Sequence, residues 1–89
     1  MSLQEYRKKI DALDEQLLEL VAKRLEICKE ISDYKLKNNL PIQDQEREKK
    51  ILGERVKAFQ ERGFDDETFI KGLFEVIIKK SREVQLPSA

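Results

Sequence analysis

A long apolar stripe near the start of the chain constrains the fold more than any other feature. Between residues 3 and 38, apolar or aromatic residues recur at alternating steps of three and four, with no Gly or Pro inside the stretch: Ile10, Leu13, Leu17, Leu20, Ile27, Ile31 and Tyr34. This spacing places them on one face of an α-helix. We therefore expect one helix over residues 3–38, about 54 Å long at 1.5 Å per residue.

Two shorter helices are expected after it, over residues 44–62 and 65–85. Asp44 can cap the first of them, and Gly63 follows its end. Asp65 can cap the second, with Phe64 and Phe69 spaced as a hydrophobic staple across that cap. The sequence shows no alternating strand pattern, so the predicted fold class is all-α with three helices.

The length of the first helix points to a second copy of the chain. A compact monomer of 89 residues has a radius of gyration of about 12 Å and a diameter of about 30 Å. The two shorter helices, each about 30 Å long, cannot cover a 54 Å stripe. We therefore expect a helical homodimer in which the long helices pack together. A bend in the first helix, giving a monomeric bundle, is the alternative.

Arg24 interrupts the apolar stripe at a position where a leucine would be expected. A guanidinium stays charged, and its burial without a partner costs several kcal/mol, so Arg24 requires an anion. Other inward positions of the three helices are also polar: Lys35, Asp44, Arg47, Glu48, Ser81 and Gln85. Several cations with one or two nearby acids suggest a polar cavity that suits a small dianion.

Each of these residues also has an ordinary structural explanation. Arg24 could form a buried ion pair with Glu48, and Lys35 could extend to solvent from its helix end. Ser81 and Gln85 could lie beyond the core, where the third helix frays near Pro87. In addition, Asp44 is a good cap in any case, Arg7 alone would be a surface charge, and Cys28 is by default a small buried hydrophobe.

Composition excludes several classes of function. Acidic and basic residues balance at 18 each, which gives no general attraction to nucleic acid or to an anionic membrane. One cysteine and no histidine exclude a disulfide framework, a zinc site and a histidine-based nucleophilic triad within one chain. Without an apolar run typical of a signal peptide or a membrane span, the expected location is the cytoplasm.

Three segments resemble the all-helical (AroQ) class of chorismate mutases. They are the opening YRKKIDALDEQLLELVAKR, the connector PIQDQEREK and the closing LFEVIIKKSREVQ. The resemblance covers nearly the whole length, so residues 1–89 are expected to form a single chorismate mutase domain. It implies an intertwined homodimer with two active sites and no cofactor or metal. The implied reaction is the Claisen rearrangement of chorismate to prephenate in Phe and Tyr biosynthesis.

The resemblance also implies a role for each polar residue. Arg7 would reach into the partner protomer's site, and Arg24 would grip a substrate carboxylate. Lys35 and Gln85 would hydrogen-bond the ether oxygen. The resemblance places Asp44 and Glu48 near the ring hydroxyl. It assigns Arg47 and Ser81 to supporting the carboxylate end of the pocket. Lys35, Gln85, Arg24 and Glu48 are the expected catalytic residues.

Two other functions stay open. An isochorismate-pyruvate lyase shares the implied fold and much of the cationic pocket, but the presence of Glu48 argues against it. A non-enzymatic helical dimerisation module explains the long stripe but not the polar residues at core positions.

Overall fold

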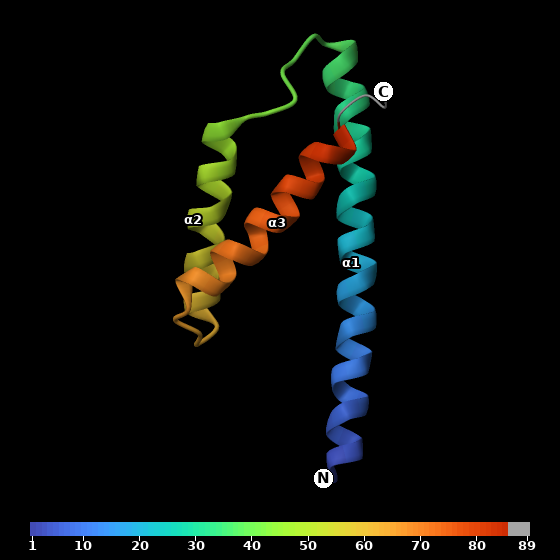
Figure 1. Cartoon of the computed structure of the whole chain (residues 1–89), viewed down its shortest axis with the longest axis vertical. Coiled ribbons are helices and arrows are strands. Elements are labelled where there is room, and N and C mark those ends of the chain that lie inside the picture. Colours follow the sequence, from blue (N-terminus) through green and yellow to red (C-terminus); the bar gives the residue numbers. More distant parts are fainter. Residues whose placement is uncertain (86–89) are drawn as a thin grey trace.

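The computed structural model describes residues 1–85, which form three α-helices: α1 (Leu3–Lys37), α2 (Gln45–Glu61) and α3 (Glu67–Gln85) (Figure 1). The described residues contain no strand, so the all-α prediction is confirmed. The first two helices match their expected bounds to within one residue at each end. The third begins two residues later than expected.

The ends of α1 and α2 follow the capping signals of the sequence. The Ser2 hydroxyl accepts a hydrogen bond from the Glu5 amide at 3.2 Å, and an Asp44 oxygen accepts one from the Arg47 amide at 3.0 Å. The chain leaves α1 through Asn39, whose φ of 52° lies in the left-handed region that asparagine tolerates. The predicted role of Asp44 as a cap is confirmed.

The predicted cap of the third helix is wrong by one residue. Asp66, not Asp65, accepts a hydrogen bond from the Phe69 amide at 3.1 Å. The Asp65 carboxylate instead accepts from the Gln60 side chain at 3.1 Å, across the turn that Gly63 opens with a φ of 91°. Two adjacent aspartates could each serve as the cap, and the turn uses one of them to close itself.

Packing is organised around α3. This helix contacts both α1 and α2, whereas α1 and α2 do not pack directly on each other. The α2–α3 turn is held by Phe59, whose ring lies 5.2 Å from that of Phe64 and 6.1 Å from that of Phe69, centroid to centroid. The staple expected between Phe64 and Phe69 is therefore replaced by a cluster in which both rings pair with Phe59.

The N-terminal half of α1 extends away from the other two helices (Figure 1). The molecule is 55 Å along its longest axis, and its radius of gyration is 16.4 Å rather than the 12 Å of a compact monomer. Because α1 is one continuous helix, the alternative of a bend is wrong.

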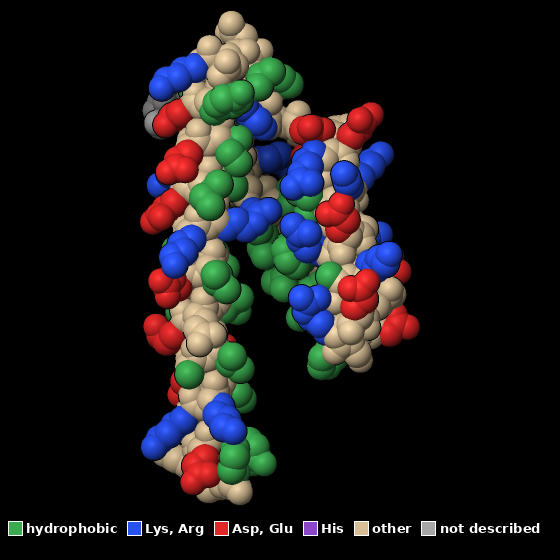
Figure 2. Space-filling model, turned by 180° about the vertical axis from the view of Figure 1, so that it is seen from behind, with side chains coloured by type: hydrophobic (Ala, Val, Ile, Leu, Met, Phe, Trp, Pro, Cys, Tyr) green, Lys and Arg blue, Asp and Glu red, His purple; other side chains and the backbone are tan. Residues whose placement is uncertain are grey.

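Much of the apolar stripe is consequently open to solvent. Hydrophobic side chains line one side of α1 along its length, bordered by charged ones (Figure 2). Leu13, Leu17 and Leu20 are 60%, 58% and 63% exposed, and Ile10 and Tyr6 are also exposed. The three helices of one chain therefore leave this face uncovered.

Candidate active site

A cavity of about 330 Å³ lies between the C-terminal half of α1, the connector to α2, the first half of α2 and the end of α3. This volume falls in the range of small-molecule sites. Seven of the eight predicted site residues line it, namely Arg24, Lys35, Asp44, Arg47, Glu48, Ser81 and Gln85. The structure thus brings together residues that are up to 61 positions apart in the sequence.

Arg24 finds its partner on α3 rather than on α2. Its guanidinium donates a hydrogen bond to the Ser81 hydroxyl, which in turn donates to the Ile77 carbonyl at 2.8 Å. The alternative in which Arg24 forms an ion pair with Glu48 is therefore wrong. Because its bonded partner is neutral, the positive charge of Arg24 is left for a ligand.

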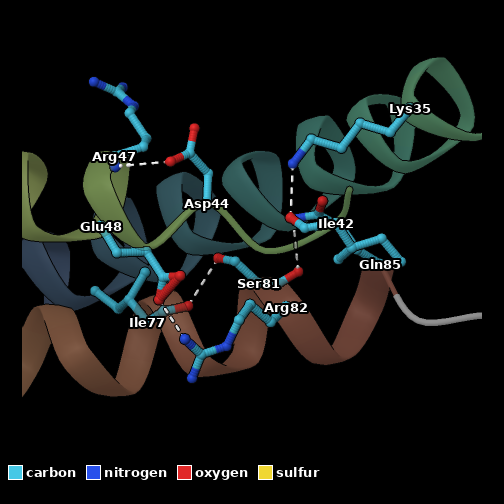
Figure 3. A network of polar contacts seen from close by, with 9 residues as sticks. All are labelled: Lys35, Ile42, Asp44, Arg47, Glu48, Ile77, Ser81, Arg82 and Gln85. Atoms are coloured by element: carbon cyan, nitrogen blue, oxygen red, sulfur yellow. Dashed lines mark hydrogen bonds and ion pairs between the residues drawn. The ribbon is translucent and has the colours of Figure 1, made fainter. Parts of the chain in front are cut away.

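Lys35 is half-buried, and its ammonium group donates to the Ile42 carbonyl at 2.7 Å (Figure 3). The alternative in which Lys35 extends to solvent is wrong. The bond crosses from α1 to the connector, and it holds the ammonium at the cavity wall. Here too, the cation is hydrogen-bonded to a neutral group, so no carboxylate balances its charge.

Ser81 and Gln85 are both buried, so the alternative of a frayed helix end is wrong for these two residues. The Gln85 side-chain amide donates to the Ser81 carbonyl at 3.1 Å, and the Gln85 carbonyl accepts from the Ser32 hydroxyl at 2.8 Å. The side-chain oxygen of Gln85 is buried without a partner among the described residues. The amide nitrogen of Gln85 carries two N–H groups, so one can bond the Ser81 carbonyl while the other donates to a ligand. The expected fraying near Pro87 lies outside the described residues.

Glu48 makes an ion pair that joins α2 to α3. One of its oxygens contacts the Arg82 guanidinium, while the other is buried and has no partner among the described residues (Figure 3). The Glu48 side chain is 19% exposed and that of Arg82 is 36% exposed. The Arg47 side chain, although part of the cavity wall, points away from this pair (Figure 3).

The charge of the cavity wall favours an anion. Five cationic side chains face two carboxylates, a surplus of three positive charges, with the cations being Arg24, Lys35, Arg47, Arg55 and Arg82. A hollow of about 580 Å³ on the connector is larger, but it combines Lys35 with the carboxylates Asp44 and Glu46. Of the two, the smaller cavity therefore has the wall charge that a dianion would require.

Two residues that line the site, Arg55 and Arg82, and one that supports it, Ser32, were missed from the sequence, although their spacing carries a signal. Ser32 lies eight residues after Arg24, and Arg55 lies seven after Glu48, so each shares a helix face with a predicted site residue. Arg82 likewise continues the line of Phe74 and Ile78 at steps of four. The guanidinium of Arg55 lies 5.7 Å from the centre of the Phe74 ring. Cys28 is buried, as expected of a small hydrophobe, and it lines the cavity.

Arg7 is the one predicted site residue that does not line the cavity of its own chain. It is exposed on the free half of α1, 17 residues before Arg24, or about 25 Å along the helix axis. A side chain cannot span that distance. Its assignment to a partner's site stays a prediction.

The described residues lack any helix long and apolar enough to span a bilayer. They also lack any group of three or more His, Cys, Asp or Glu side chains placed to hold a metal ion.

Comparison with known proteins gives the family. The family model described as chorismate mutase type II matches residues 6–86. The chain belongs to the type II chorismate mutases. A chorismate mutase from Methanocaldococcus jannaschii is 36% identical over 83 residues, which cover 93% of this chain and 83% of that protein. The resemblance to all-helical chorismate mutases inferred from the sequence is thus confirmed.

Two further relatives place this family member in context. The bifunctional chorismate mutase/prephenate dehydratase of Escherichia coli K12 is 40% identical over 75 residues, covering 84% of this chain but 19% of that protein. The structure of a conserved hypothetical protein from Pyrococcus furiosus superposes with a TM-score of 0.75 at 37% identity, covering 94% of this chain and 95% of that one. The same fold is therefore shared along nearly the whole chain.

Proposed function

We propose that this chain is a chorismate mutase that converts chorismate to prephenate for Phe and Tyr biosynthesis. The single observation that carries the proposal is the cavity in which seven of the eight expected residues meet with a cationic surplus. Family membership supports the same activity. We further propose that the whole chain forms one chorismate mutase domain, and that its expected site residues act as follows.

The reaction is an intramolecular Claisen rearrangement, in which a C–O bond breaks while a C–C bond forms. No nucleophile and no proton transfer are required, which is compatible with a chain that has no histidine. The protein has to hold the substrate with its enolpyruvyl arm folded over the ring. Arg24, supported by Ser81 and Arg47, would hold a substrate carboxylate, because guanidinium groups bind carboxylates in a fixed geometry.

Negative charge grows on the ether oxygen as the C–O bond breaks. Lys35 and Gln85 would stabilise that charge as fixed hydrogen-bond donors, in the manner of an oxyanion hole. Asp44 and Glu48 would lie near the ring hydroxyl. The unpartnered buried oxygen of Glu48 supports this role, since a buried acceptor requires a donor and a hydroxyl group supplies one.

We propose an intertwined homodimer as the working form. The exposed apolar face of α1 supports it, because a single chain leaves Leu13, Leu17 and Leu20 in water. In such a dimer the free half of α1 would carry the partner's Arg7 to each cavity, where it could hold the second carboxylate of the substrate.

The decisive experiment follows the loss of chorismate absorbance with the purified chain, alongside isochorismate under the same conditions. We expect turnover of chorismate to prephenate and none of isochorismate to pyruvate. Pyruvate release from isochorismate would favour the lyase of the same fold.

The variant Arg24→Leu separates an enzyme from a dimerisation module. We expect it to fold and to lose turnover, because it removes a carboxylate ligand while keeping an apolar residue in the stripe. A more stable Arg24→Leu variant, combined with a parent chain that neither turns over nor binds chorismate, would establish the dimerisation module instead.

A further inference from the structure

Glu48 presents an electrostatic difficulty at the proposed site. A carboxylate in the wall of a cavity that takes a dianion repels its ligand, and the attraction or repulsion between charges is strong where water is excluded. Glu48 is mostly buried, so solvent screens its charge only weakly. A cationic group of the protein has to compensate for the negative charge of Glu48.

Arg82 is placed to do this. Its guanidinium contacts one oxygen of Glu48 and leaves the other oxygen buried and free. The two residues come from different helices, Glu48 from the first turn of α2 and Arg82 from the last turn of α3. The contact therefore fixes the orientation of the carboxylate relative to both walls of the cavity (Figure 3).

Among the ion pairs of residues 1–85, Arg82 pairs with one carboxylate, that of Glu48. The outer groove that both residues also line contains Glu75 and Lys79, one acid and one base, which together add no net charge. Among the other cations of the cavity wall, Arg24 and Lys35 donate to Ser81 and Ile42 rather than to Glu48. Arg55 pairs with Glu54 instead of Glu48. Neutralisation of Glu48 thus depends on Arg82.

We propose that Arg82 is a positioning residue for the proposed reaction. It neutralises Glu48 so that an anionic ligand can enter, and it orients the carboxylate so that the free oxygen accepts a hydrogen bond from the ligand. The inference rests on the proposed function, and it adds a residue that the sequence did not single out. Arg82 acts through Glu48 and does not itself hold the substrate.

The test is a double-substitution cycle on the full chain, using Arg82→Leu, Glu48→Gln and the two combined, with Arg82→Lys as the conservative variant. Leucine keeps the helix propensity and the apolar stem of the arginine. Lys80→Leu, on the same helix, exposed and outside both the cavity and the outer groove, is the matched control. Turnover of chorismate gives kcat and KM, and thermal unfolding checks that each variant folds.

We expect Arg82→Leu to lower kcat/KM by about tenfold, mainly through KM, because the unpaired carboxylate repels the dianion. Arg82→Lys should retain most of the parent activity, since it restores the positive charge. In the Glu48→Gln background, which has no charge to neutralise, Arg82→Leu should have little further effect. Lys80→Leu should match the parent chain.

Three results would overturn the proposal. If Arg82→Leu lowers the Tm but leaves kcat/KM at the parent value, the ion pair only joins two helices. If Arg82→Leu is equally damaging with and without Glu48→Gln, Arg82 contacts the ligand directly. If the parent chain itself does not turn over chorismate, the proposed function falls, and the role of Arg82 falls with it.

Discussion

Among the single residues, Lys35 has the proposed role that is easiest to test, which is to stabilise the charge on the ether oxygen. Its ammonium group lies at the cavity wall, bonded only to a backbone carbonyl. Removing one donor from an oxyanion hole typically raises the barrier by about 2.7–4 kcal/mol. We therefore expect Lys35→Ala to lower kcat by about 10²–10³-fold while changing the Tm little. Chorismate turnover and thermal unfolding measure the two effects.

The control for Lys35 is Lys37→Ala, two residues further along α1 and exposed in the same last turn. It should keep the parent kcat, because its ammonium does not line the cavity. Near-normal turnover in Lys35→Ala would contradict the assignment of Lys35 to the ether oxygen.

Gln85 carries a prediction about pH. An amide can donate a hydrogen bond at any ordinary pH, whereas a carboxyl group donates only when protonated. The parent chain should therefore show nearly constant turnover around neutral pH. In Gln85→Glu, turnover at pH 7 should fall and should recover as the pH drops toward about 4.3, the ordinary pKa of a glutamic acid. Profiles of kcat between pH 4.5 and 8 check this, and a steep loss in the parent between pH 5 and 8 would count against Gln85 as a donor.

Individual polar residues were predictable because a charge or an amide on an apolar helix face is conspicuous in the sequence. Arg24, Lys35 and Gln85 were found in this way. Their hydrogen-bond partners were not, since Ser81, Ile42 and Ser32 are brought to them only by the way the helices pack. Periodicity gives the face of a helix but not the register between two helices.

At the scale of the helices, the candidate site depends on the packing of α3. It is the only helix of the described chain that contacts both others, and its C-terminal end carries Ser81, Arg82 and Gln85. Ser32 on α1 bonds the Gln85 carbonyl, which as a helix-terminal group would otherwise be unsatisfied and buried. This bond fastens the end of α3 to α1.

We expect Ser32→Ala to destabilise the chain by about 1–3 kcal/mol, because it leaves that carbonyl without a partner. Turnover should fall as well, since Gln85 would lose its fixed position. The exposed neighbour Asp33→Ala is the control and should change neither quantity appreciably. Chemical denaturation measures the stability, and an unchanged free energy of unfolding in Ser32→Ala would show that water replaces the hydroxyl.

Helix boundaries were predictable where one residue type dominates the end. Asp44 and Gly63 each stand alone as a cap or a turn residue, and both expectations are confirmed. The start of α3 was missed because Asp65 and Asp66 compete for the same role. The side-chain bond from Gln60 to Asp65 across the turn, which helix-capping patterns do not predict, decides between them.

At the scale of the whole molecule, the free half of α1 is the surface that one chain leaves uncovered. The length argument from the sequence predicted that one chain cannot cover this helix, and the extended shape agrees with it. The sequence could not give the tilt of α3 or the separation of α1 from α2, because these depend on side-chain packing rather than on periodicity. The arrangement of two chains stays a prediction.

Mixing two inactive variants tests that arrangement. Arg7→Ala and Lys35→Ala should each be inactive alone. In a mixed dimer, one of the two sites would combine the intact Lys35 of the Arg7→Ala chain with the intact Arg7 of the Lys35→Ala chain. After unfolding and refolding an equimolar mixture, we expect about a quarter of the parent turnover, because half of the dimers are mixed and each has one working site. A mixture no more active than its components would refute the shared site.

The bond between Lys35 and the Ile42 carbonyl has a consequence for how tightly the substrate is held. A ligand that draws the ammonium toward itself has to compete with that carbonyl. The neutral ether oxygen of the ground state is a weak competitor, whereas the partly charged oxygen of the transition state is a strong one. On the proposed assignment, the carbonyl of the connector therefore weakens the bond between Lys35 and the ether oxygen of the substrate. The same carbonyl competes less well with the more strongly charged oxygen of the transition state. Interactions that strengthen only along the reaction raise kcat rather than merely tightening binding.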